Sequence, residues 1–193
     1  SKICSILLVD EKRQDELVIR ATQSLNEEYR RKPNLKIHKS LLGSVVQMRK
    51  PVAVADVRKE EKYFYRDLAV KENLTSMLAV PMIVKDKTVG VINVYTQEPH
   101  QFTEEEINVL QMIANQAAVA VENTKLMDEA VKAKEALETR KVIERAKGIL
   151  MRLNNLSEEA AYRLINKKSM DSCRSMKEIA ESIILMADFQ KGQ

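Results

Sequence analysis

The sequence predicts an α+β domain with a central antiparallel sheet, a long connecting helix and a small all-α unit of three helices. Three observations lead to this prediction. All four prolines lie before residue 100, where short apolar runs alternate with polar breaks. Residues 101–147 contain neither glycine nor proline, which permits one unbroken helix. Two more sets of helix-capping residues follow this segment. Hydrophobic residues make up 45% of the chain, enough for a folded core.

Short apolar runs in the first half predict strands. The predicted strands are residues 4–9, 16–21, 50–56, 79–84 and 89–95. The strongest local signal is a β-hairpin, because the last two runs flank a short polar break at residues 85–88. The segment at 50–56 is opened by Pro51, which suits the start of a strand. Residues 41–48 predict a short helix beginning near Gly43.

A long helix is predicted to begin at Thr103, because Glu106 three residues later completes a capping box. If unbroken to Met151, it spans about 70 Å at about 1.5 Å per residue. Apolar residues recur along it at alternating spacings of four and three. These seam residues are Leu126, Ala130, Ala133 and Leu137. Such a seam indicates pairing with another helix, and a second copy of the chain is the simplest partner. We therefore expect a homodimer through this helix.

Two shorter helices are predicted after a break at residues 154–156. Ser157 caps the first, and Ser175 with Glu178 forms a second capping box that opens a helix to about Phe189. The apolar stripe of the last helix is Ile179, Ile183 and Met186. Leu150, Met151 and Met170 are expected in the core rather than in contact with a partner. The predicted units are residues 1–125, a connecting and dimerising helix at 103–140, and a three-helix unit at 135–190.

Several classes of protein are disfavoured by the composition. No run of eighteen apolar residues is present, so no transmembrane helix is expected, and no secretory leader opens the chain. Cys4 and Cys173 are too sparse for a disulfide framework, which favours a reducing cytoplasm. His38 and His100 lack zinc-ligand spacing, and the glycines form no phosphate-binding loop. We expect no metal site, no cofactor and no enzyme.

Positive charge concentrates in the C-terminal part. Between residues 136 and 177, ten basic residues face five acidic ones, an excess larger than the net charge of +4 of the whole chain. Phosphate contact needs such an excess. By composition alone, however, a solvated helix face is the favoured explanation.

The first half resembles a GAF domain over roughly residues 3–125, without the usual first helix of that family. The residues that carry the resemblance are 75–82, 90–95 and 102–106, with 42–46, 50–52 and 55–57 in the middle section. The resemblance implies a ligand-sensing domain whose small-molecule ligand is unknown.

The second half resembles an ANTAR domain over about residues 135–188, on residues 140–151, 157–162, 169–171 and 179–184. Ile165-Asn166 stands where relatives often carry Leu-Arg. The resemblance implies a bacterial antitermination regulator, which binds paired RNA hairpins with hexanucleotide loops and prevents a terminator from forming. It also implies that basic residues of this half, together with Tyr162, contact RNA. These candidates are Arg140, Arg145, Lys147, Tyr162, Lys167, Lys168, Arg174 and Lys177.

Three of these positions carry particular expectations. Arg140 and Lys147 lie two helical turns apart, so they share a face and are expected to hold one RNA loop. Tyr162 is expected either to stack on an unpaired base or to be partly buried with its hydroxyl in water. Gly148 costs a helix about 1 kcal/mol relative to Ala, which indicates close approach of RNA or, slightly favoured, of a neighbouring helix.

Two other hypotheses stay open. The seam at residues 126–137 also fits a ligand-sensing module whose helical tail binds a protein partner, with no affinity for nucleic acid. A DNA-binding three-helix regulator fits loosely, although the spacing of a helix-turn-helix with its small turn glycine is missing. An enzyme of GAF type is the least favoured.

Overall fold

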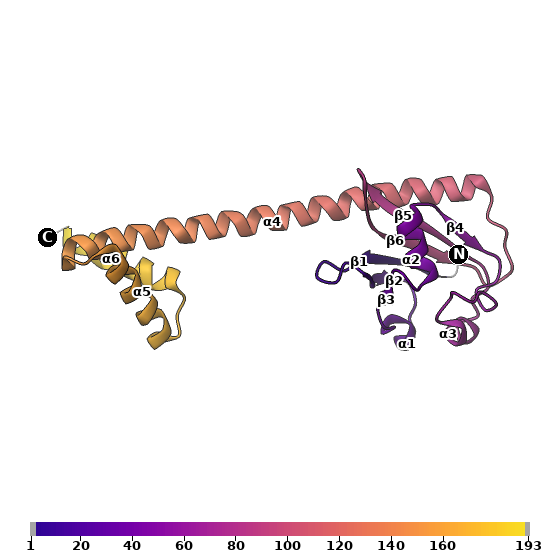
Figure 1. The fold of residues 1–193 in the computed structure, drawn as a ribbon, viewed down its shortest axis with the longest axis horizontal. Helices are drawn as coiled ribbons and strands as arrows, with labels where there is room; N and C mark the ends of the chain where they lie inside the picture. The colour runs from indigo at the N-terminus through magenta and orange to yellow at the C-terminus, as the bar shows by residue number, and fades with distance from the viewer. Residues whose placement is uncertain (1–2, 192–193) are drawn as a thin grey trace. The chain divides into compact units, whose positions relative to one another are not determined.

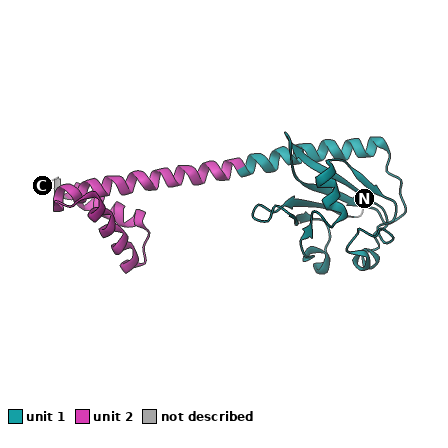
Figure 2. Cartoon of the chain, in the orientation of Figure 1, with its two compact units in different colours: residues 1–125 teal, residues 126–193 magenta. Residues whose placement is uncertain are grey.

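The computed structural model describes residues 3–191 and divides into two compact units, residues 1–125 and 126–193 (Figure 1, Figure 2). Unit 1 holds a six-stranded sheet with four helical segments, and unit 2 holds helices alone. The expected α+β fold with a long helix and three C-terminal helical segments is therefore confirmed. No helix in the described part of the chain has a stretch long and apolar enough to cross a membrane.

All strand pairs in the sheet are antiparallel, in the order β3-β2-β1-β6-β5-β4. The strands are β1 Ile3–Val9, β2 Glu16–Thr22, β3 Leu35–Lys36, β4 Val52–Val54, β5 Met77–Val84 and β6 Lys87–Tyr95. The five predicted strands are confirmed, and the two-residue β3 was missed. The β5–β6 turn is tighter than the predicted break: only Lys85 and Asp86 connect the strands, and Lys85 takes the positive φ that the turn needs.

Three short helices lie between the strands of unit 1: α1 Glu27–Arg30, α2 Leu41–Met48 and α3 Arg66–Lys71. The predicted α2 is confirmed, but it begins before Gly43 because the Ser40 side chain caps it by accepting a hydrogen bond from the Gly43 amide. A side chain at Gly43 would collide with the backbone of Ile37, so a glycine is required there. The sequence pattern did not predict α1 or α3.

The two faces of the sheet have different coverings, as the alternation along β1 shows. Ile3 and Leu7 point into a cluster formed with α1, α2 and α3. Cys4, Ile6 and Leu8 point to the opposite face, where the first turns of α4 (Glu104–Asn154) pack. Buried alanines at positions 114 and 118 allow this helix to approach the sheet closely. One face is therefore closed by α4, and the other is available for a pocket.

Unit 2 contains the rest of α4, then α5 (Glu158–Ser172) and α6 (Met176–Lys191). The predicted caps are confirmed: Ser157 accepts from the amide of Ala160, and Ser175 and Glu178 form a reciprocal capping box. The chain leaves α4 through Asn155, which adopts the left-handed conformation that ends helices.

The core of unit 2 is small and excludes some residues that the sequence analysis placed on its apolar side. Its buried residues are Ala146, Leu150, Ala161, Ile165 and Ala180. Ile179 and Ile183 pack against this cluster as expected. Met151, Met170 and Met186, however, are exposed. Their assignment to the core was wrong, because apolar spacing defines a helix face but not how wide a strip of that face the neighbouring helices cover.

Candidate RNA-binding interface and sensor pocket

Lys147 does not lie on an open basic surface. Its side chain is only 8% exposed, and its Nζ donates to Glu158 Oε1 at 2.7 Å and to both carboxylate oxygens of Glu144 at 3.0 Å. The hydrogen bond to Glu158 raises the pKa of Lys147 and lowers the pKa of Glu158. The expectation that Lys147 and Arg140 together hold an RNA loop is corrected: Lys147 joins α4 to the first turn of α5.

Two other candidates are also occupied by partners within unit 2. Arg145 Nη2 lies 3.1 Å from Asp188 Oδ2, and Arg174 Nε lies 4.0 Å from Glu178 Oε1. Both arginines are at least half exposed, and such surface pairs contribute little to stability. They are therefore secondary candidates, since each must exchange a carboxylate for a phosphate.

Four candidate cations remain available. Arg140, Lys167, Lys168 and Lys177 are all exposed, and none forms an ion pair with any residue in the described range 3–191. Arg140 lies on α4, the two adjacent lysines on α5 and Lys177 on the first turn of α6. All three helices of unit 2 thus contribute at least one uncompensated positive charge.

Tyr162 and Gly148 add an open surface to this set. Tyr162 is 47% exposed although it follows the fully buried Ala161, so part of its side chain is open to solvent, as stacking on a base requires. A Cβ placed on Gly148 would meet nothing within 4 Å. The expectation that a neighbouring helix packs against Gly148 is therefore wrong, because the space beside it is empty in this chain.

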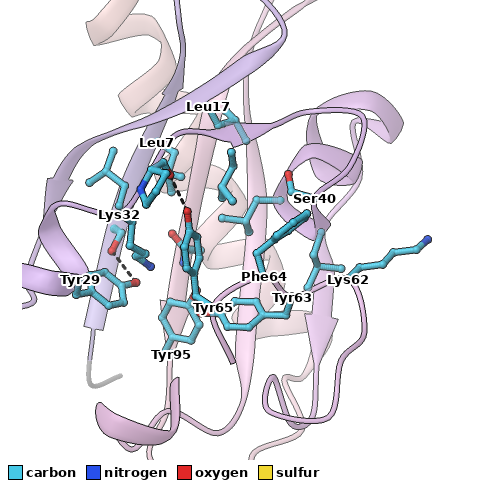
Figure 3. Close-up of a pocket in the computed structure, with 17 residues that line it drawn as sticks. Leu7, Leu17, Tyr29, Lys32, Ser40, Lys62, Tyr63, Phe64, Tyr65 and Tyr95 are labelled. Carbon is cyan, nitrogen blue, oxygen red and sulfur yellow. Dashed lines mark hydrogen bonds between the residues drawn. The ribbon is translucent and has the colours of Figure 1, made fainter. Parts of the chain in front are cut away.

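Unit 1 contains a pocket on the sheet face opposite α4, with a cavity of about 20 Å³ (Figure 3). Five aromatic residues line it together with several aliphatic ones: Tyr29, Tyr63, Phe64, Tyr65 and Tyr95. Inside, the Tyr63 and Tyr95 hydroxyls are 2.9 Å apart and hydrogen-bonded. A cavity of this size accommodates about one water molecule.

Two polar groups of this pocket lack a full set of partners. The Lys32 Nζ lies 3.4 Å from the Tyr29 ring centroid and 4.9 Å from that of Tyr65, and burial lowers the pKa of Lys32 to about 7 although the charge of Glu72 opposes this. Asn93, on β6, is 1% exposed, and its Oδ1 has no hydrogen-bond donor among the described residues. The sequence prediction identified no ligand-binding residue here.

The comparisons with known proteins agree with this division. A family model described as GAF domain matches residues 1–122, and one described as ANTAR domain matches residues 131–184. The chain belongs to the GAF family and carries an ANTAR domain.

Two regulatory proteins are similar to a stretch of this chain. The Transcriptional regulatory protein PdtaR of Mycobacterium tuberculosis is 40% identical over 63 residues, which is 33% of this chain and 31% of that protein. The Nitrate regulatory protein of Klebsiella oxytoca is 38% identical over 65 residues, which is 34% of this chain and 16% of that protein. The chain thus spans a third or less of the length of these two relatives.

A solved structure, the GAF domain of a phosphoenolpyruvate-protein phosphotransferase from Coxiella burnetii, superposes on 67% of this chain and 76% of its own with a TM-score of 0.60 at 26% identity. All the pocket-lining residues fall within the GAF match, and all eight candidate RNA contacts fall within the ANTAR match. Among those eight candidates, the structure distinguishes basic residues that already form an ion pair with a carboxylate of unit 2 from those that form none in the described range.

Proposed function

We propose that the chain is a signal-responsive RNA-binding regulator of transcription antitermination, which binds paired hairpin loops in nascent mRNA and prevents a terminator from forming. The observation that carries this proposal is the set of four unpaired cations, Arg140, Lys167, Lys168 and Lys177, on an ANTAR domain. The names of two relatives, both regulatory proteins, support it. The role proposed is that of a regulator rather than an enzyme.

Electrostatics gives the unpaired cations their role. A cation without an internal partner contacts a phosphate at no cost of a broken ion pair, and each such contact releases counterions from the RNA. Tyr162 adds a stacking surface for an unpaired loop base, which typically contributes about 1–3 kcal/mol per base. Lys147 acts indirectly in this scheme, because it fixes the start of α5, the helix that carries Tyr162 and two of the cations.

The exposed face of α4 supports the proposed homodimer. Leu126 and Leu137 of the predicted seam are each 53% exposed. The same spacing extends back through exposed Val119, Met112 and Val109. These positions continue one heptad pattern, and Asn123 occupies a seam position of the kind at which a buried asparagine selects a parallel, in-register dimer. Two RNA-binding domains in one dimer bind two hairpins with a gain from effective concentration.

The RNA-binding proposal is tested with a labelled two-hairpin RNA over a salt series, with duplex DNA as comparison. The variant is Arg140→Ala/Lys168→Ala, and the matched control is Lys141→Ala/Arg163→Ala. The control removes the same charge from the same domain, but both of its residues are paired, with Glu138 and Glu159. We expect the variant to lose at least about tenfold in RNA affinity and to lower the salt slope by about 1 per contact, and the control to change little.

Equal losses in variant and control would contradict the proposed interface, because they would mean that only total charge matters. Equal affinity for duplex DNA and hairpin RNA would contradict RNA recognition.

The dimer is tested by sedimentation of Leu126→Glu against Val131→Glu. Both residues are exposed, at 53% and 55%, but only Leu126 lies on the seam. We expect the first variant to be monomeric and the second to remain dimeric. A dimer in both cases would place the association on another surface.

A second candidate function is a ligand-sensing module whose helical tail binds a protein. The exposed Leu185, Met186 and Phe189 on α6 favour it, since large apolar side chains close together on one helix are typical of interaction surfaces. This alternative predicts no salt-dependent RNA binding, so the salt series separates the two.

A further inference from the structure

We propose that the pocket of unit 1 binds a small organic anion that also carries a hydrogen-bond donor, such as a hydroxycarboxylate, with its anionic group on Lys32 and its donor on Asn93 Oδ1. This inference deepens the proposed sensory role of the GAF unit and rests on that role. It does not depend on RNA binding.

The first argument is the state of Lys32. Its ammonium faces the rings of Tyr29 and Tyr65 at 3.4 and 4.9 Å from their centroids and forms no ion pair with any residue the structure describes (Figure 3). The negative charge of Glu72, at the end of α3, raises the pKa of Lys32, but it offsets the effect of burial only in part. A partly buried cation that faces aromatic rings and forms no ion pair gains from an anion brought into the same pocket.

The second argument is the unsatisfied acceptor. Asn93 is 1% exposed, lines the same pocket as Lys32, and its Oδ1 accepts no hydrogen bond within the described part of the chain. Leaving such a group unpaired typically costs about 1–3 kcal/mol. A hydroxyl or N–H group of a ligand relieves this cost, whereas a simple anion without a donor does not.

The third argument is size. The cavity of about 20 Å³ accommodates roughly one water molecule, and most of its walls are apolar or aromatic, although Ser5, Ser40 and Lys62 also line it. A ligand of a few heavy atoms therefore requires the smallest rearrangement. Phe64 lines the pocket and is 61% exposed, so its neighbours hold it less than they hold the buried Tyr63 and Tyr95.

Binding would act on two segments at once. Lys32 follows α1, whose Tyr29 it covers, and also contacts Tyr65, which precedes α3. An anion that draws the ammonium away from these rings changes the packing of both segments. Such a difference in contacts between free and bound states is what a sensory domain requires.

The test uses the full chain without RNA and three probes: glycolate, acetate and glycolamide. Glycolate has the anion and the donor, acetate only the anion, and glycolamide has donors without the charge. Calorimetry measures affinity, and NMR of the lysine Cε groups follows the Lys32 titration. The variant Lys32→Met is compared with Lys62→Met, since Lys62 also lines the pocket but is exposed (Figure 3).

We expect glycolate to bind more tightly than either other probe, to raise the pKa of Lys32 above about 7, and to bind more weakly as the pH rises through 7. Lys32→Met should weaken glycolate binding by at least about tenfold and Lys62→Met by little. Methionine makes favourable contacts with aromatic rings, so we expect the Lys32→Met variant to fold. An unchanged thermal transition serves as the control for folding.

Equal binding of glycolate and glycolamide, equal binding of glycolate and acetate, or no saturable glycolate binding would overturn the proposal. Because no RNA is present, these outcomes are independent of whether the ANTAR domain binds hairpins.

Discussion

The two units of this chain are stabilised by different means. In unit 1 the sheet buries large side chains on both faces, with Leu17, Leu74 and Met77 at most 1% exposed on one and Val80 and Met82 fully buried on the other. The hydrophobic cluster of unit 2 contains five buried residues, three of which are alanines. Burial of alanine removes little apolar area from water.

Unit 2 therefore depends more on polar interactions at its helix ends. A side-chain cap opens α5, a capping box opens α6, and the Lys147–Glu158 ion pair joins α4 to α5. Unit 1 instead has enough buried area to tolerate two costly polar groups, Lys32 and Asn93, in its pocket. A large core can include a binding site, whereas a small core leaves its functional residues on the outside.

The largest effect is expected from truncating the cores. Ile165→Ala in unit 2 and Leu74→Ala in unit 1 both remove side chains that are 0% exposed and should each cost about 2–5 kcal/mol. We expect the first to unfold unit 2 at ambient temperature and the second to leave unit 1 folded. Hydrogen exchange with mass spectrometry locates the loss. If Leu74→Ala unfolds unit 1 while Ile165→Ala leaves unit 2 folded, unit 1 is the less stable of the two.

A smaller loss of stability in unit 2 is expected when the pH is lowered. Because Lys147 holds the pKa of Glu158 below its usual 4.5, this pair stabilises unit 2 above pH 4.5, and the contribution disappears as the pH falls through the lowered pKa. Glu158→Gln should lower the thermal midpoint of unit 2 at neutral pH and flatten its acid dependence. Glu159→Gln is the control, since Glu159 pairs only with the exposed Arg163 among the described residues. Identical acid profiles for the two variants would show that the Lys147–Glu158 pair contributes nothing to the acid dependence.

The smallest effect concerns Gly148. Since nothing lies within 4 Å of the position of an added Cβ, Gly148→Ala should stabilise unit 2 by about 1 kcal/mol through helix propensity. If RNA approaches this backbone, the same variant should bind hairpin RNA more weakly although it melts higher. A lower melting temperature would mean that the helix is more tightly packed at Gly148 than the structure shows.

Local signals predicted much of this fold. The β5–β6 hairpin, the capping boxes at Thr103 and Ser175 and the long helix, which has no glycine before Gly148, each depend on residues a few positions apart, and all are confirmed. The short helices α1 and α3 were missed because four to six residues contain too little periodicity to detect. The homodimer and the RNA contacts stay predictions.

The sequence by itself determined the fold class, the order of the longer elements and the two families. Only the tertiary structure decided which charges are available: Glu158 lies eleven residues from Lys147 across a helix break, and its contact with Lys147 removes that residue from the basic surface. The pocket likewise brings together Lys32, Tyr65 and Asn93 from distant segments. Secondary structure follows from interactions within a few residues, whereas burial and pairing depend on which segments meet in space.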